Sequence, residues 1–127
     1  MTNELEIPIG TIAQPQLAAG SVIVKDVTIE PAKEGSKAKI VRVHCKHPSR
    51  DELVLLSNIK LRKVQGNNET IKRDALWWNL DTEGNIKMNS AVADFLKFYS
   101  KKKLEDFKGI EIKTEHDAAG YLCIKAY

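Results

Sequence analysis

At 127 residues, the chain has the length of one domain that buries its own hydrophobic core without disulfide or metal cross-links. Its 43% hydrophobic and 29% charged residues are typical of a globular protein. No apolar run approaches the ~20 residues that span a bilayer, and we expect no membrane partner. The net charge of +3 permits a polyanionic partner without requiring one. The polar first residues lack the pattern of a signal peptide, so we expect a cytoplasmic protein.

The start of the chain contains two prolines and two glycines and shows little hydrophobic periodicity. We therefore expect a loosely ordered segment over residues 1–20, followed by a single domain over residues 21–127. Three runs rich in β-branched and aliphatic residues, each bounded by turn-forming residues, predict strands at 21–29, 38–45 and 53–64.

Strict alternation divides the second and third predicted strands into two faces. In the second strand, Val41, Val43 and Cys45 share one face, and Arg42 and His44 share the other. In the third strand, Leu53, Leu55, Ile59 and Leu61 form the predicted apolar face. A half-buried antiparallel sheet has this pattern.

The remaining elements are a hairpin, a helix and a second hairpin. Alternation around a turn predicts a hairpin, or an extension of the sheet, over residues 75–88. A helix over residues 90–101 follows, with Asn89 or Ser90 as its N-cap. Three lysines at its end complement the helix dipole, and they would add backbone contacts if the domain bound nucleic acid. After Gly109, two short runs predict a closing hairpin.

This order of three strands, one helix and a terminal hairpin resembles the oligonucleotide/oligosaccharide-binding (OB) fold over about residues 20–127. The cadence of residues 104–113, followed by the run Gly-Tyr-Leu-Cys-Ile, is similar to that of small archaeal and phage proteins of this class. The resemblance implies an all-β protein with one helix, folded as a β-barrel. It also implies a ligand lying across the second and third strands.

The polar outer face of these two strands is the candidate binding site. It carries Arg42, His44, Asn58, Lys60 and Arg62. Cations of this kind bind the backbone of single-stranded DNA or RNA, so nucleic acid is the first candidate partner. The alternative is that these residues form the ordinary solvated face of an amphipathic sheet.

Trp77 is a second candidate binding residue. Neighbouring residues of a strand face opposite sides, so Trp78 is assigned to the core with Leu76 and Leu80, and Trp77 to the surface. An exposed tryptophan serves as a stacking platform for a base or as an interface anchor. The alternative is that the N-terminal segment or the helix covers Trp77.

Metal binding and catalysis find little support. His44 and Cys45 diverge on a strand, and with His47 they do not complete a four-ligand set, so we expect neither a metal nor another cofactor. Glu111 and Lys113 match the Glu-x-Lys half of a metal-dependent nuclease site, but such short patterns recur by chance on polar strands. We therefore expect no catalytic residues and no enzymatic activity.

The competing hypothesis is a protein-interaction module, either a subunit of a larger complex or a homo-oligomer. Val54 and Leu56 fall on the otherwise polar face of the third predicted strand, where they would form an exposed apolar patch. A protein partner or self-association therefore remains an alternative to nucleic acid.

Overall fold

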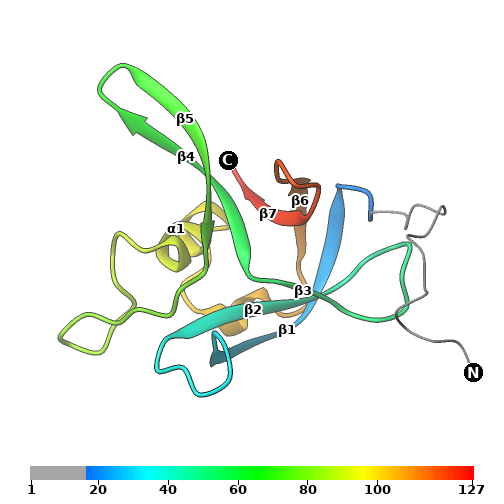
Figure 1. Ribbon diagram of the computed structural model, residues 1–127, viewed down its shortest axis with the longest axis horizontal. Coiled ribbons are helices and arrows are strands. Elements are labelled where there is room, and N and C mark those ends of the chain that lie inside the picture. Colours follow the sequence, from blue (N-terminus) through cyan, green and yellow to red (C-terminus); the bar gives the residue numbers. More distant parts are fainter. Residues whose placement is uncertain (1–16) are drawn as a thin grey trace, which may run out of the picture.

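The computed structural model describes residues 17–127 as a curled, seven-stranded mixed sheet that forms a half-barrel around one α-helix (Figure 1). The strands are β1 (Ser21–Pro31), β2 (Lys39–Lys46), β3 (Val54–Leu56), β4 (Asn58–Gln65), β5 (Asn68–Ala75), β6 (Glu111–His116) and β7 (Leu122–Ala126). The helices are α1 (Ala91–Phe98) and the 3₁₀ helix η2 (Leu104–Phe107). Neither helix has the length and apolarity needed to cross a membrane.

The strand order β3-β2-β1-β6-β7-β4-β5 explains the curl of the sheet. Only Ser57 separates β3 from β4, yet β3 pairs antiparallel with β2 and β4 pairs parallel with β7. The direct connection from β3 to β4 therefore joins distant positions of the sheet order. The prediction of an all-β, barrel-like protein with one helix and a terminal hairpin is confirmed.

The core lies between the concave face of the sheet and α1. Val41, Val43 and Cys45 of β2 are fully buried, as their alternation predicts. From α1, Phe95 is also fully buried, and its ring stacks on Phe107 of η2 with a centroid distance of 4.1 Å. This packing holds the helix against the open side of the half-barrel.

The third predicted strand is divided, and half of its facing assignment is wrong. Ile59 and Leu61 are buried as predicted, but Leu53 and Leu55 are 41% and 51% exposed. Val54 and Leu56, expected on the exposed face, are buried instead. The cause is the interruption at Ser57, because one extra residue moves every following side chain to the other face. The apolar patch that favoured a protein-interaction module does not exist in that form.

The chain between residues 65 and 88 also differs from the prediction. A two-residue turn at positions 66 and 67 joins β4 to β5, which the sequence analysis missed. No residue of β5 is buried, so the strand lacks the apolar alternation by which strands are recognised. The expected hairpin at 75–88 is reduced to two isolated bridges, Ile40↔Trp77 and Leu80↔Ile86, and Leu80 is exposed. The β4–β5 hairpin extends away from the body of the sheet (Figure 1).

Both ends of α1 have recognisable caps. The Ser90 side chain accepts a hydrogen bond from the backbone N–H of Ala93, which confirms one of the two predicted N-caps. The helix ends at Phe98, three residues before the predicted end, and Ser100 adopts a left-handed φ of 56°. The backbone N–H of Lys101 then donates to the carbonyl of Leu96 at 2.8 Å, which closes a Schellman motif.

The predicted loose N-terminal segment lies mostly outside the described residues, which begin at Leu17. The part that is described is hydrogen-bonded to the sheet. The Leu17 carbonyl lies 2.7 Å from His116 Nε2, and Thr114 exchanges backbone and side-chain hydrogen bonds with Gly20. Residues 17–20 therefore belong to the folded domain.

Candidate functional site

The two predicted site residues on β2 lie on the outer face beside β1. The Arg42 guanidinium forms an ion pair with Glu30 at 2.8 Å, and His44 Nε2 lies 2.8 Å from the Thr28 hydroxyl. Both side chains are half-buried. The Glu30 carboxylate therefore offsets the positive charge that Arg42 would offer to a phosphate.

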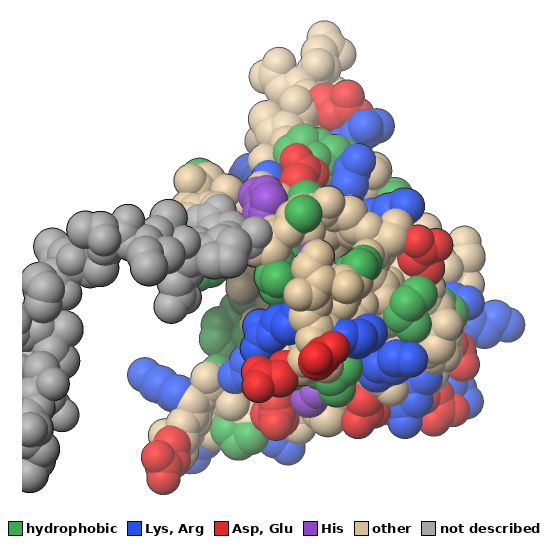
Figure 2. All heavy atoms as spheres, turned by 90° about the vertical axis from the view of Figure 1, so that its right-hand side faces the viewer, with side chains coloured by type: hydrophobic (Ala, Val, Ile, Leu, Met, Phe, Trp, Pro, Cys, Tyr) green, Lys and Arg blue, Asp and Glu red, His purple; other side chains and the backbone are tan. Residues whose placement is uncertain are grey.

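The predicted basic residues on β4 are likewise paired. Lys60 Nζ donates to the His116 carbonyl at 2.6 Å and lies 3.5 Å from the Glu115 carboxylate, and its side chain is only 19% exposed. Arg62 pairs with Glu69 of β5 at 3.3 Å. On the face shown in Figure 2, acidic and basic side chains are also interspersed. The predicted basic face is thus a set of ion pairs rather than a continuous positive strip.

Asn58, the fifth residue of the predicted face, opens into a groove of about 370 Å³ between the β3–β4 bend and the β6–β7 loop. We call this the β3–β4 groove. Its walls include the exposed side chains of Leu55, Arg73 and Tyr121. Leu55 is the register partner of His44 on β2, and Arg73 is the register partner of Lys60 on β4. The groove therefore joins the β2 and β4 parts of the predicted face.

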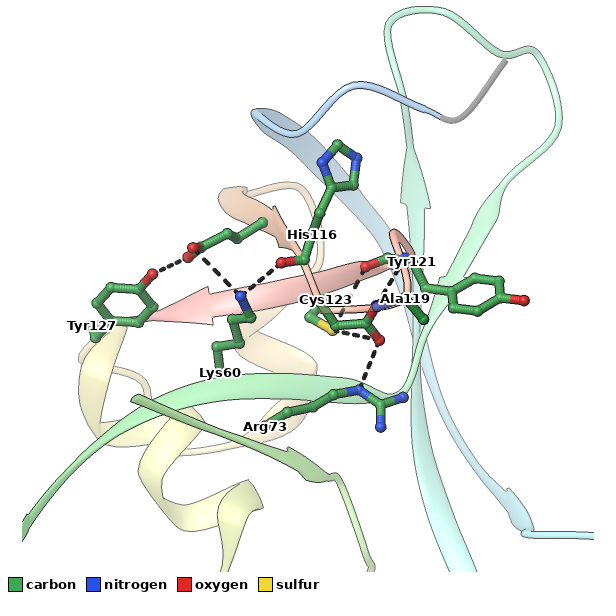
Figure 3. A network of polar contacts seen from close by, with 9 residues as sticks. Lys60, Arg73, His116, Ala119, Tyr121, Cys123 and Tyr127 are labelled. Carbon is green, nitrogen blue, oxygen red and sulfur yellow. Dashed lines mark hydrogen bonds and ion pairs between the residues drawn. The ribbon is translucent and has the colours of Figure 1, made fainter. Parts of the chain in front are cut away.

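Asp117 shapes the wall formed by the β6–β7 loop. Its Oδ1 accepts hydrogen bonds from the backbone N–H groups of Ala119 and Tyr121, and its Oδ2 lies 3.0 Å from Arg73 Nε (Figure 3). Burial acts to raise the pKa of the Asp117 carboxyl, but these N–H groups and the Arg73 charge outweigh it and hold the pKa below 3.8. The ionised carboxylate thus clamps β5 to the loop.

The ring of Tyr121 points away from this polar network (Figure 3). It is 72% exposed, which makes it an unusually accessible aromatic side chain. Its backbone is fixed by Asp117, so the ring stands at the rim of the β3–β4 groove on an ordered loop. The site therefore combines an exposed aromatic face, an amide and a guanidinium.

A second part of the polar network involves Tyr127, at the end of the chain. The Tyr127 hydroxyl donates to the Glu115 carboxylate, which also faces Lys60. This hydrogen bond lowers the pKa of Glu115 below 4.5 and raises that of Tyr127 above 10. Lys60 is therefore held between a carboxylate and a carbonyl, and it supports the site rather than standing free in solvent.

The two cysteines are free thiols, and both are buried. Burial raises the pKa of Cys45 to about 12 and also raises that of Cys123. Each thiol is thus protonated at neutral pH and is a poor nucleophile. Within residues 17–127, no three His, Cys, Asp or Glu side chains gather in a way that would hold a metal ion.

Trp77 lies apart from the other predicted site residues. It is 41% exposed, as its alternation with Trp78 predicts, and it lines a separate hollow with Lys87 and Ser90. Trp78 is half-buried and packs against the core. Of the predicted site residues, Asn58 lines the β3–β4 groove, and His44 and Lys60 are register partners of residues that line it. Trp77 lies elsewhere.

Arg73 and Tyr121 are not among the site residues predicted from the sequence. A signal for Arg73 was present in the turn itself, because a Gly-Asn pair directly after a β-like run is typical of a two-residue hairpin turn. For Tyr121 the signal was an aromatic residue directly after the turn residues of the closing hairpin. Comparisons of this chain with protein-family models, with curated proteins and with solved structures found no match.

Proposed function

We propose that the protein binds single-stranded DNA or RNA across the outer face of β2, β3 and β4, without catalysis, and that the β3–β4 groove receives a base. The observation that carries the proposal is the exposed ring of Tyr121 at the rim of the groove, beside Asn58 and Arg73. Every base has a π-face, so an accessible aromatic ring on an ordered loop binds single strands with little sequence preference.

The arrangement of the strands supports the same proposal. Strands that precede the helix, a helix before the closing hairpin, and a parallel pairing of β4 with β7 resemble the OB type of barrel. In that type the ligand lies over the second and third strands, and the loop of the closing hairpin forms one wall. In this proposal, the β3–β4 groove and the β6–β7 loop take these two roles.

Each wall of the groove offers a different contact to a nucleotide. The Tyr121 ring stacks on the base, the Asn58 amide donates to or accepts from its edge, and Arg73 reaches the phosphate. Arg73 already shares its charge with Asp117, and Arg42 with Glu30. We therefore expect modest affinity, dominated by stacking, with a shallower salt dependence than that of a protein with many free cations.

Fluorescence anisotropy of labelled oligothymidine and oligouridine, each about 12 nucleotides long, tests this proposal at low and moderate salt. Replacing Tyr121→Ala removes one stacking partner and should weaken binding by about 1–3 kcal/mol, whereas Tyr121→Phe should retain most of the affinity. Phe98→Ala is the matched control, because Phe98 is an exposed aromatic residue on α1 outside the groove. No measurable binding, or equal affinity of the Tyr121→Ala and wild-type proteins, would overturn the proposal.

A further inference from the structure

A second groove, of about 590 Å³, runs between residues 78–88 and the C-terminal end of α1. It shares no lining residue with the β3–β4 groove. Its floor is apolar and includes Trp78, Leu80 and Met88, of which Met88 is 71% exposed. An unbranched, polarizable methionine at such a surface adapts to apolar side chains of different shapes.

Four lysines surround this floor, and we call the site the lysine groove. They are Lys97, Lys101, Lys102 and Lys103. Eight ion pairs link acidic and basic side chains in residues 17–127, and none of them includes these four lysines. The lysine groove therefore keeps its positive charge, in contrast to the outer face of β2 and β4.

The fold places these lysines together by an unusual helix end. Ser100 takes the left-handed conformation that is normally given to glycine, so the chain reverses and the next three lysines follow the groove. Cations near a helix C-terminus offset its dipole, but this effect fades within the last turn. It accounts for Lys97 and Lys101, and it does not account for an exposed apolar floor beneath two further lysines.

We propose that the lysine groove binds an acidic peptide segment of a partner protein, with one or two large apolar side chains on the floor and flanking carboxylates at the lysines. Charge complementarity carries the choice of occupant, because four unpaired ammonium groups border an apolar surface. A single-stranded nucleic acid fits less well. Trp78, the aromatic residue of this groove, is half-buried, and the rest of the floor is aliphatic or thioether.

Trp78 provides the signal for the experiment. The chain has two tryptophans, so the full-length protein with Trp77→Phe reports on Trp78 alone. We would titrate it with a synthetic peptide that alternates aspartate with leucine and phenylalanine, and with the same peptide in which asparagine replaces every aspartate. The acidic peptide should shift the Trp78 emission and bind at least about tenfold more tightly than the asparagine peptide, equivalent to about 1.4 kcal/mol.

Three variants locate the binding. The pair Lys97→Glu and Lys102→Glu should weaken binding of the acidic peptide by about tenfold or more. The matched pair Lys33→Glu and Lys37→Glu has the same charge change in the β1–β2 loop, where neither lysine forms an ion pair with a described residue, and should have little effect. Met88→Ala tests the floor without changing charge, and it should weaken both peptides.

Three results would overturn the proposal. One is equal binding by the groove pair and the loop pair, which would indicate nonspecific attraction to a basic protein. Another is no change in Trp78 emission or in anisotropy of the labelled peptide. The third is an oligonucleotide whose binding depends on Lys97 and Lys102 while the acidic peptide does not compete, since the lysines would then serve nucleic acid. The Tyr121→Ala variant should bind the acidic peptide as tightly as the wild-type protein does. The peptide test therefore stands even if the proposed nucleic-acid binding at the β3–β4 groove is wrong.

Discussion

The two grooves of the protein use charge in opposite ways. Around the β3–β4 groove, Arg73 and Lys60 face the carboxylates of Asp117 and Glu115, which fixes the walls in one geometry. Around the lysine groove, four ammonium groups have no carboxylate among the described residues within ion-pair distance. Ion pairs therefore hold the walls of the β3–β4 groove in place, whereas the unpaired lysines of the lysine groove remain available to a ligand.

The largest expected effect comes from removing the support of the lysine groove. Phe95→Ala should lower the free energy of unfolding by about 3–5 kcal/mol, because its buried ring stacks on Phe107 and a cavity would remain. Phe98→Ala, on the same helix but exposed, should cost less than about 1 kcal/mol. Urea denaturation of both variants measures the difference, and similar midpoints would show that α1 is not anchored through Phe95.

The adjacent tryptophans distinguish the lysine groove from the neighbouring hollow. Trp78 packs against the core and lines the groove, so Trp78→Ala should cost about 2–3 kcal/mol, less than for a fully buried tryptophan. Trp77→Ala should cost less than about 1 kcal/mol. Thermal melts compare the two, and a larger loss for Trp77→Ala would contradict the assigned facing.

Acid should loosen the walls of the β3–β4 groove, because two carboxylates hold them in place. The folded-state pKa values of Asp117 and Glu115 lie below 3.8 and 4.5, so their contribution to stability is complete above those values. It is lost as the pH falls through the lower folded-state values. Melting temperature should therefore drop toward pH 3 more steeply in the wild-type protein than in Asp117→Asn, which lacks one of these carboxylates; parallel curves would show that Asp117 contributes no acid sensitivity.

The smallest effect is expected at the end of α1. Ser100→Gly places the preferred residue at a φ of 56° and should raise the free energy of unfolding by about 0.5–1 kcal/mol. Peptide binding to the lysine groove should persist, because the Schellman hydrogen bonds remain. Differential scanning calorimetry measures the gain, and a loss of stability would mean that the serine side chain has a structural role of its own.

Hydrophobic alternation predicted those elements in which a buried face repeats without interruption. Val41, Val43 and Cys45, and the pair Ile59 and Leu61, were assigned to the buried face from this pattern alone. The pattern failed at Ser57, because a single unpaired residue reverses the facing and leaves no compositional trace. It failed again at β5, where nothing is buried and the turn sets the register.

The candidate site was predictable only where it lay on well-patterned strands. Asn58 and Lys60 were identified because β4 alternates strictly beyond Ser57. Arg73 and Tyr121 lie beside Asn58 because Arg73 forms an ion pair with Asp117, 44 positions away in the chain. An ion pair between such distant residues has no local signature in the sequence. The unpaired state of the four lysines is equally invisible in sequence, since it depends on which carboxylates come near in space.

The parallel pairing of β4 with β7 has a consequence for biosynthesis. The β1–β2 and β4–β5 hairpins join strands that are close in sequence and can pair as soon as each emerges from the ribosome. One edge of β4, however, pairs with β7, so it has no strand partner until residues 122–126 have been made. Because synthesis adds only about 5–20 residues per second, this long-range contact cannot form until some seconds after β4 has been made. Until then, the nascent chain exposes the apolar side chains Ile59 and Leu61, which makes this interval the one most open to aggregation and to chaperone binding.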